Sequence, residues 1–397
     1  MYLCVVKWIN RVFDFFRSAR RRIALAGVCS IFMLGLTWYS DRSVHTVGTE
    51  DILMRHAYLL MKVLGRSDKM VPDDILAVNV SYDRQLAPVC DIYGSYMGTR
   101  SVAHRGHLLE FLEELKGTGY KAILIDIFFD GDNPAPGDAA LIALINGMDR
   151  IVVPSHVSGN VSPMLKADKI ASGDYSVNIY ENDFVKYPFR LGDGSPSLAL
   201  QAHRLAGGKA LTEGRILDQP TMILPLDITM RSPENDDGTL AWYNLGANLL
   251  DNPYTRASIP DLVRDKIVVI GDYVSDSDTH GSYVGDMTGP AIHINALDAL
   301  SRGLHRINLW EMLVWALAYM AICTSIILGM SVWRKLPFRR GPFVEFCLGF
   351  ISFAVFLWIL EFILYICFGK FHDTFLVVAF LSIYTIFCQQ LNKKHPL

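Results

Sequence analysis

Residues 121–128 read KAILIDIF, an apolar run of strand length interrupted by a single acid. A short run of this kind predicts a β-strand that is buried on both faces of a sheet. The stretch before it, 103–116, places Leu108, Leu112 and Leu115 on one face, which is the spacing of an α-helix. A helix that leads into a doubly buried strand is the repeating unit of a parallel α/β sheet.

The same alternation continues on both sides of this unit. We therefore predict an α/β fold, with a mostly parallel sheet covered by helices on both faces. The stretch 158–193 is rich in Gly, Ser, Asn and Asp, which predicts loops and short antiparallel strands. The other predicted elements are strands at 75–81, 150–154, 240–245 and 266–270, and helices at 138–146, 195–205 and 290–302.

Long apolar runs flank this α/β region. A helix needs roughly 20 mostly apolar residues to cross the hydrocarbon layer of a membrane. A cleaved signal peptide is the alternative for the first run, but no small-residue cleavage site follows it. We predict an outer domain at 43–305 and four transmembrane helices, at 23–40, 307–332, 343–368 and 371–388.

The short segments between the runs set the predicted orientation. Basic residues gather in the tail 1–22, in the loop 333–342 and in the tail 389–397. Short loops rich in Lys and Arg stay in the cytoplasm. We therefore expect both termini and this loop to be cytoplasmic, and the domain 43–305 to be periplasmic or extracellular. The loop and the N-terminal tail are the expected contact sites for a cytoplasmic partner, and simple topological charge is the alternative.

Several ionisable residues fall within or beside the apolar runs. Glu361 lies inside the third run, where a charged group is either functional or reaches the outer interface. Glu311, Glu345, His372 and Asp373 lie at the ends of runs and are read as interfacial. Elsewhere, the net charge of −3 gives no reason to expect nucleic acid as a partner.

Three stretches of the sequence share a pattern with one known family. They are ILAVNVSYDRQL, TRSVAHRGHLLEFLEEL and GYKAILIDIFFD (75–86, 99–115 and 119–130), SPSLALQAHRLAG (195–207) and KIVVIGDYVSDSDTHGSYVGDMTGPAIHINALDALSRG (266–303). These stretches resemble the CHASE2 domain, an extracytoplasmic sensory module of bacterial receptors. The resemblance implies a sensory domain in the inner membrane of a bacterium, held between one span and three further spans, usually followed by a kinase or cyclase. No such output domain is expected in the residues after 388, and a Gly-x-Trp-Pro-x-Pro-Arg turn of the family is replaced by GSYMGTR at 94–100.

Acidic residues follow three of the predicted strands. In an open parallel sheet, ligands bind outside the carboxyl ends of the strands, so these acids are expected at one edge. They predict a small-ligand site, or a site for Ca²⁺ or Mg²⁺, which prefer oxygen ligands. The alternative is that Asp is common in turns and helix caps. The candidate residues are Asp83, Asp126, Asp130, Asp132, Asp272, Asp276 and Asp278, with Arg100 and His280 as companions.

Taken together, the sequence favours a membrane-anchored sensor. A small ligand or envelope protein would bind outside, and a separate cytoplasmic or membrane effector would receive the signal. The alternative is a scaffold or accessory subunit that senses nothing. We expect no enzyme, since no nucleophile and base can be paired, and no cofactor apart from the cation considered above. Receptors of this class are often dimers, and a homodimer is compatible with the sequence.

Overall fold

A computed structural model of the protein describes two compact units, which are treated one at a time below. The helical unit comprises residues 1–43 and 306–397, and the α/β unit comprises residues 44–305. The predicted tail 1–22 and most of the predicted loop 333–342 lie outside the described residues. The described residues are 23–43, 50–65, 68–91, 93–177, 183–209, 211, 217–235, 237–275, 278–327 and 342–394.

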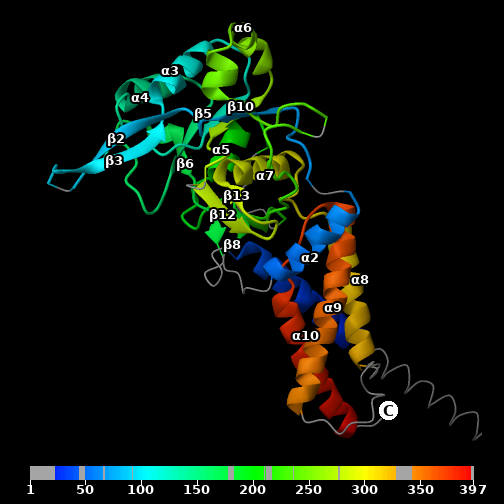
Figure 1. Ribbon diagram of the computed structural model, residues 1–397. Helices are drawn as coiled ribbons and strands as arrows, with labels where there is room; N and C mark the ends of the chain where they lie inside the picture. The colour runs from blue at the N-terminus through cyan, green and yellow to red at the C-terminus, as the bar shows by residue number, and fades with distance from the viewer. Residues whose placement is uncertain are drawn as a thin grey trace, which may run out of the picture. The chain divides into compact units, whose positions relative to one another are not determined.

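A six-stranded parallel sheet forms the centre of the α/β unit (Figure 1). Its strand order places β11, late in the sequence, between β1 and β4. Residues 75–79, 122–125 and 267–271 are buried along their whole length, as the apolar runs predict. In order across the sheet, the strands are β10 (Tyr243–Asn244), β1 (Ile75–Asn79), β11 (Ile267–Gly271), β4 (Ala122–Ile125), β5 (Ile151–Ser155) and β6 (Ile170–Ser172).

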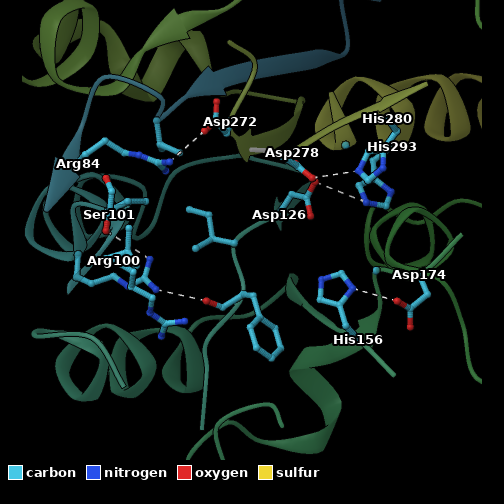
Figure 2. Close-up of a pocket in the computed structure, with 18 of the residues that line it drawn as sticks. Arg84, Arg100, Ser101, Asp126, His156, Asp174, Asp272, Asp278, His280 and His293 are labelled. Atoms are coloured by element: carbon cyan, nitrogen blue, oxygen red, sulfur yellow. Dashed lines mark hydrogen bonds and ion pairs between the residues drawn. The ribbon is translucent and has the colours of Figure 1, made fainter. Parts of the chain in front are cut away.

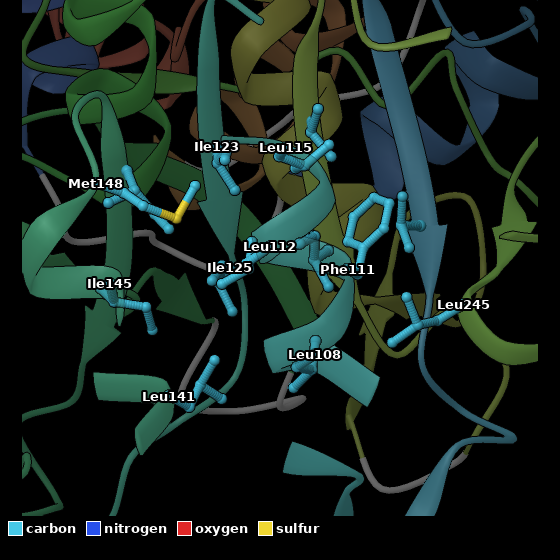
Figure 3. Packing of buried hydrophobic residues seen from close by; sticks show 14 of the residues in the cluster. Leu108, Phe111, Leu112, Leu115, Ile123, Ile125, Leu141, Ile145, Met148 and Leu245 are labelled. Carbon is cyan, nitrogen blue, oxygen red and sulfur yellow. The ribbon is translucent and has the colours of Figure 1, made fainter. Parts of the chain in front are cut away.

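Helices cover both faces of this sheet, because alternate strand residues point to opposite sides. On one face, Ile123 and Ile125 of β4 pack with Leu108 and Leu112 of α3 and with Leu141 of α4 (Figure 3). Burying one such side chain contributes roughly 1.5–3 kcal/mol. This face carries α3 (Arg105–Glu114), α4 (Asp138–Gly147), the π-helical turn η2 (Leu245–Leu250) and α6 (Pro253–Leu262). The other face contacts α5 (Leu198–Leu205) and α7 (Gly289–Ser301).

The smaller elements differ in part from the sequence prediction. A hairpin of β2 (Arg84–Cys90) and β3 (Tyr96–Ala103) precedes α3, where no strands are predicted. The predicted strand 240–245 is only two residues long, because the backbone turns into η2 at Leu245. The region 158–193 does hold short strands as predicted. The remaining elements are α2 (Glu50–Val63), η1 (Ala167–Lys169) and a second sheet of β7 (Ser176–Val177), β8 (Asp183–Pro188), β9 (Thr221–Ile223), β12 (Thr279–Ser282) and β13 (Met287–Thr288).

The helical unit has three helices that are long and apolar enough to span a membrane, among the residues that the structure describes. They are Ile23–Arg42, the whole of α8 (Leu309–Ile327), and Cys347–Phe368 within α9 (Pro342–Phe368). The fourth predicted span corresponds to α10 (Phe375–Lys394), which begins later than predicted. Its apolar part, Phe375–Ile386, is shorter than the other three, so the fourth span is not confirmed.

The helical unit also contains a buried group of charged residues, called here the helix-unit cluster. It consists of Asp41, Glu311, Glu361, Lys370 and His372. His372 places Nδ1 2.6 Å from Asp41 Oδ2 and Nε2 2.5 Å from Glu311 Oε1. Lys370 Nζ lies 2.6 Å from Glu311 Oε2. Glu361, for which an outer-interface position was one of two alternatives, is instead buried beside His372, and Glu311 is buried as well.

Candidate functional site

A cavity of about 500 Å³ lies at the carboxyl ends of the parallel strands and is called here the strand-end pocket. Each of five neighbouring strands contributes the residue or residues that follow its last position. This is where open α/β sheets bind their ligands, and the volume is typical of small-molecule sites. In strand order, the contributions are Val80 after β1, Asp272 after β11, Asp126 after β4, His156 after β5 and Asp174 after β6.

The walls of the strand-end pocket separate by charge, as Figure 2 shows. The hairpin and the start of α3 supply the basic wall, with Arg84, Arg100 and Arg105. The opposite wall is made by acids and histidines from the strand ends, from β12 and from α7. Its members that line the cavity are Asp126, His156, Asp174, Tyr175, Asp278, His280 and His293.

Each arginine of the basic wall already has a carboxylate partner. Arg84 lies 3.5 Å from Asp272. Arg100 lies 2.8 Å from Asp130. Arg105 Nε donates to Asp138 over 2.6 Å, and both of those side chains are buried. The basic wall therefore brings little uncompensated positive charge to the cavity.

Asp272 is a well-satisfied carboxylate. It accepts hydrogen bonds from the Ser81 and Ser275 hydroxyls and from the backbone N–H groups of Val274 and Ser275. Burial alone would raise the pKa of Asp272, but these hydrogen bonds outweigh burial and hold the pKa below its ordinary value. Asp272 is therefore ionised and serves to fix the turn that follows β11.

Asp126 has the opposite environment. Only 10 % of its side chain is exposed, and it accepts no hydrogen bond from any residue that the structure describes. His293 Nε2 lies 3.7 Å from Asp126 Oδ2, which is longer than a hydrogen bond. Burial, together with the charge of Asp278, raises the pKa of Asp126 well above its ordinary value.

His293 completes the buried part of the acidic wall. Its Nδ1 lies 2.9 Å from the Tyr187 hydroxyl, and both side chains are buried. Burial lowers the pKa of His293 to about 3, with a smaller effect from His156 and His280. Burial thus favours the neutral form of Asp126 as well as that of His293.

The comparisons with known proteins bear on this geometry. The family model of the CHASE2 domain matches residues 51–331, most of the chain. The chain belongs to the CHASE2 family. This is a family of extracytoplasmic sensory domains, and the match covers the whole strand-end pocket. No curated protein and no solved structure matches the chain.

Within this CHASE2 domain, the structure brings five of the predicted residues together. Asp126, Asp272, Asp278, Arg100 and His280 all line the strand-end pocket. The prediction depended on the strand ends meeting at one edge, and the parallel register provides this.

The other predicted residues lie elsewhere. Asp130 and Asp132 line an adjacent cavity of about 460 Å³, which shares Arg100 with the strand-end pocket. Asp83 lines neither cavity, because its carboxylate binds His107 Nδ1 at 2.9 Å and the Gly246 backbone N–H at 3.0 Å. Asp276 lies outside the described residues.

Sequence reasoning missed several residues of the pocket. His293 falls in the stretch IHINALD of α7, where the resemblance to CHASE2 was strongest, and that stretch was the available signal. Tyr175 and Asp174 come from the segment 158–193, for which composition predicted loops and short antiparallel strands, so no periodic signal pointed to either residue. Arg84 and Arg105 flank the unpredicted hairpin, and without that hairpin nothing placed them at the sheet edge.

Metal binding has no support among the described residues. No group of three or more His, Cys, Asp or Glu side chains there has the arrangement to hold an ion. Gly289, the first residue of α7, has no side chain, and this allows the carboxyl groups of Asp278 and Asp126 to lie close to the helix backbone. A Cβ at this position would lie 2.6 Å from Asp278 Oδ2 and 3.1 Å from Asp126 Oδ2. The glycine thus lets both acids sit against the start of the helix, where its dipole favours negative charge.

Proposed function

We propose that this CHASE2 protein is a membrane-anchored sensor that binds a small ligand in the strand-end pocket and signals to a separate effector protein. The observation that carries the proposal is Asp126, a buried carboxyl that lines the cavity without a hydrogen-bond partner among the described residues. Buried polar groups are normally satisfied, and strongly shifted groups in a cleft mark functional sites. A ligand that binds one arrangement of the domain more tightly would shift the population of its conformations.

The proposed topology follows the distribution of basic residues. The tail 1–22 and the loop 333–342 would be cytoplasmic, and the α/β unit would be periplasmic or extracellular in a bacterial inner membrane. Cys90, the single cysteine of residues 43–305, provides the test. A membrane-impermeant thiol reagent added to intact spheroplasts should label the wild-type chain but not Cys90→Ser. Labelling that appears only after lysis would show that the α/β unit faces the cytoplasm, opposite to the proposed orientation.

A comparison of crosslinked partners tests the signalling role. Gly289→Ala should disturb the pocket, because the new Cβ would press on Asp278 and Asp126. Gly147→Ala in α4 is the matched control, since its Cβ would meet nothing within 4 Å. Each full-length chain, carrying a photo-reactive residue in the loop 333–342, is crosslinked in native membranes and its partners are identified by mass spectrometry.

The two candidate functions give different results in this experiment. For a sensor, a cytoplasmic kinase, cyclase or regulator is recovered, and its yield changes in Gly289→Ala but not in Gly147→Ala. Recovery of envelope proteins alone, at equal yield in all three chains, would replace the proposal with the scaffold alternative. We propose no catalytic role, because among the described residues that line the pocket no nucleophile lies within hydrogen-bond reach of a base.

A further inference from the structure

We propose that the ligand of the strand-end pocket is a small organic cation, whose ammonium group binds between Asp126 and Asp278. This inference rests on the proposed function, because it names the ligand class of the same pocket. Four features of the described residues lead to it: the balance of charge, the unsatisfied carboxyl, the aromatic surroundings and the geometry that disfavours a metal ion.

Two acidic side chains of the pocket, Asp126 and Asp278, lack a basic partner of the kind that the other charged residues have. The three arginines that line the pocket are each held by a carboxylate, Asp272, Asp130 or Asp138. Asp126 and Asp278 have no arginine or lysine within ion-pair distance among the described residues. Within the described part of the chain, the one ion-pair partner of Asp278 is His280, whose Nε2 lies 3.3 Å away. A bound cation would provide the compensating charge that these two acids lack.

Asp126 is the feature that most directly points to a missing donor. Nine-tenths of its side chain is buried, yet it faces the cavity and accepts no hydrogen bond from the described residues. Burying such a group without a partner is costly, because its lost hydration is not replaced by a hydrogen bond. An ammonium N–H directed at Asp126 would supply the absent hydrogen bond and would favour the ionised carboxylate.

Aromatic rings line the same pocket as the two acids. Tyr175 lines the pocket and meets His280 edge-on at 5.0 Å and His293 at 6.0 Å between ring centroids. Phe128 lines the pocket beside His156, with 5.4 Å between ring centroids. Aromatic faces attract alkylammonium groups and pack against their apolar carbons. A bare inorganic cation would gain little from these rings.

A divalent metal ion fits this wall poorly. Ca²⁺ takes six to eight oxygen ligands, as a rough rule, and Mg²⁺ requires near-octahedral geometry. The described residues provide no group of three or more ligating side chains at suitable positions. An anion is also disfavoured, since the basic wall is neutralised and the start of α7 already faces Asp126 and Asp278.

Calorimetric titration of the full chain in detergent micelles tests the ligand class. The probes are n-butylammonium, putrescine and choline, with n-butanol and butyrate as neutral and anionic counterparts of butylammonium. At least one ammonium compound should bind, while n-butanol and butyrate should not. If none of the three ammonium compounds binds more tightly than n-butanol, the proposal is wrong.

Two isosteric variants assign the binding to Asp126. Asp126→Asn removes the negative charge at constant shape and should weaken ammonium binding about ten- to hundredfold, as expected for a hydrogen bond to a charged group. Asp132→Asn lines only the adjacent cavity and should leave the affinity unchanged. Equal affinity in wild type and Asp126→Asn would overturn the assignment even if an ammonium compound binds.

A proton count separates ligand recognition from a merely structural role of Asp126. A bound cation should lower the raised pKa of Asp126, so at a pH near or below that raised pKa binding should release protons. Titrations in two buffers of different ionisation enthalpy measure this release, which should disappear in Asp126→Asn. Tight binding of butyrate would reject the ligand class yet leave a ligand-binding sensor in place. The proposed function fails separately, if Gly289→Ala leaves effector crosslinking unchanged.

Discussion

The strand-end pocket and the helix-unit cluster are two groups of buried charge with opposite internal balance. In the helix-unit cluster, both ring nitrogens of His372 face carboxylates, which an imidazolium satisfies by donating twice. Lys370 adds a second cation against Glu311. In the strand-end pocket, Asp126 and His293 face each other at 3.7 Å without a hydrogen bond.

The difference separates a structural role from a binding role. A buried ion pair that is fully hydrogen-bonded holds its elements together, and removing one partner is costly. The helix-unit cluster joins the first helix, α8, α9 and the loop before α10 in this way. A buried acid without a partner contributes no such bond, and proteins retain such groups where function requires them. The predictions below test this contrast.

The largest effect is expected for His372→Leu. The change removes the imidazolium and leaves Asp41 and Glu311 buried, with only Lys370 as a described cation beside Glu311. Loss of one partner from a buried ion pair costs roughly 3–5 kcal/mol. Thermal unfolding of the full chain in detergent should show a strongly lowered midpoint. A midpoint equal to that of wild type would show that the ion pairs of the helix-unit cluster do not stabilise the fold.

A smaller loss in the free energy of unfolding, about 1–3 kcal/mol, is expected for Asp272→Asn, because hydrogen bonds to a charged group are weakened. The size of this loss should depend on pH in a defined direction. The folded pKa of Asp272 lies below its ordinary value, so its contribution is complete above about pH 4 and is lost as the pH falls through the lowered pKa. The stability difference between wild type and variant should therefore shrink on acidification, and a constant difference would contradict this account.

The strand-end pocket and the helix-unit cluster both contain residues whose positions in the fold could not be predicted from the sequence. The apolar runs 75–81, 121–128 and 266–270 were sufficient for the parallel sheet, and the sheet rule then gathered Asp126, Asp272 and Asp278 at one edge. The pairing of Arg105 with Asp138 joins the starts of α3 and α4, two predicted helices whose mutual placement no spacing in the sequence predicts. Side chains far apart in sequence that meet at one point, such as Asp41 and His372, leave no periodic signal at all.

Asp126→Asn should act in the opposite direction to Asp272→Asn. The raised pKa means that the folded chain keeps a proton that the unfolded chain releases near pH 4, so wild type loses stability as the pH rises from there toward the raised pKa. The variant lacks this cost. We expect it to be at least about 1 kcal/mol more stable than wild type near neutral pH, since one pKa unit is worth about 1.4 kcal/mol.

The measurement is the unfolding midpoint of both chains across a pH series. The gain should be absent below about pH 4 and should grow upward from there. A variant that is less stable than wild type at neutral pH would mean that Asp126 is satisfied in the folded protein. That result would remove the contrast between the two regions.

The smallest effect is expected for Glu361→Gln, the member of the helix-unit cluster that most resembles Asp126. Its Oε2 accepts only the His372 backbone N–H, at 3.3 Å, and its Oε1 has no partner among the described residues. Glutamine keeps an oxygen for that N–H and replaces only the unpartnered atom, so we expect a change within about 1 kcal/mol. Thermal unfolding beside His372→Leu measures it. A loss of stability as large as that of His372→Leu would show that the charge of Glu361 contributes to the stabilising ion pairs. A small change would mean that these ion pairs involve only Asp41, Glu311, Lys370 and His372 among the described members of the cluster.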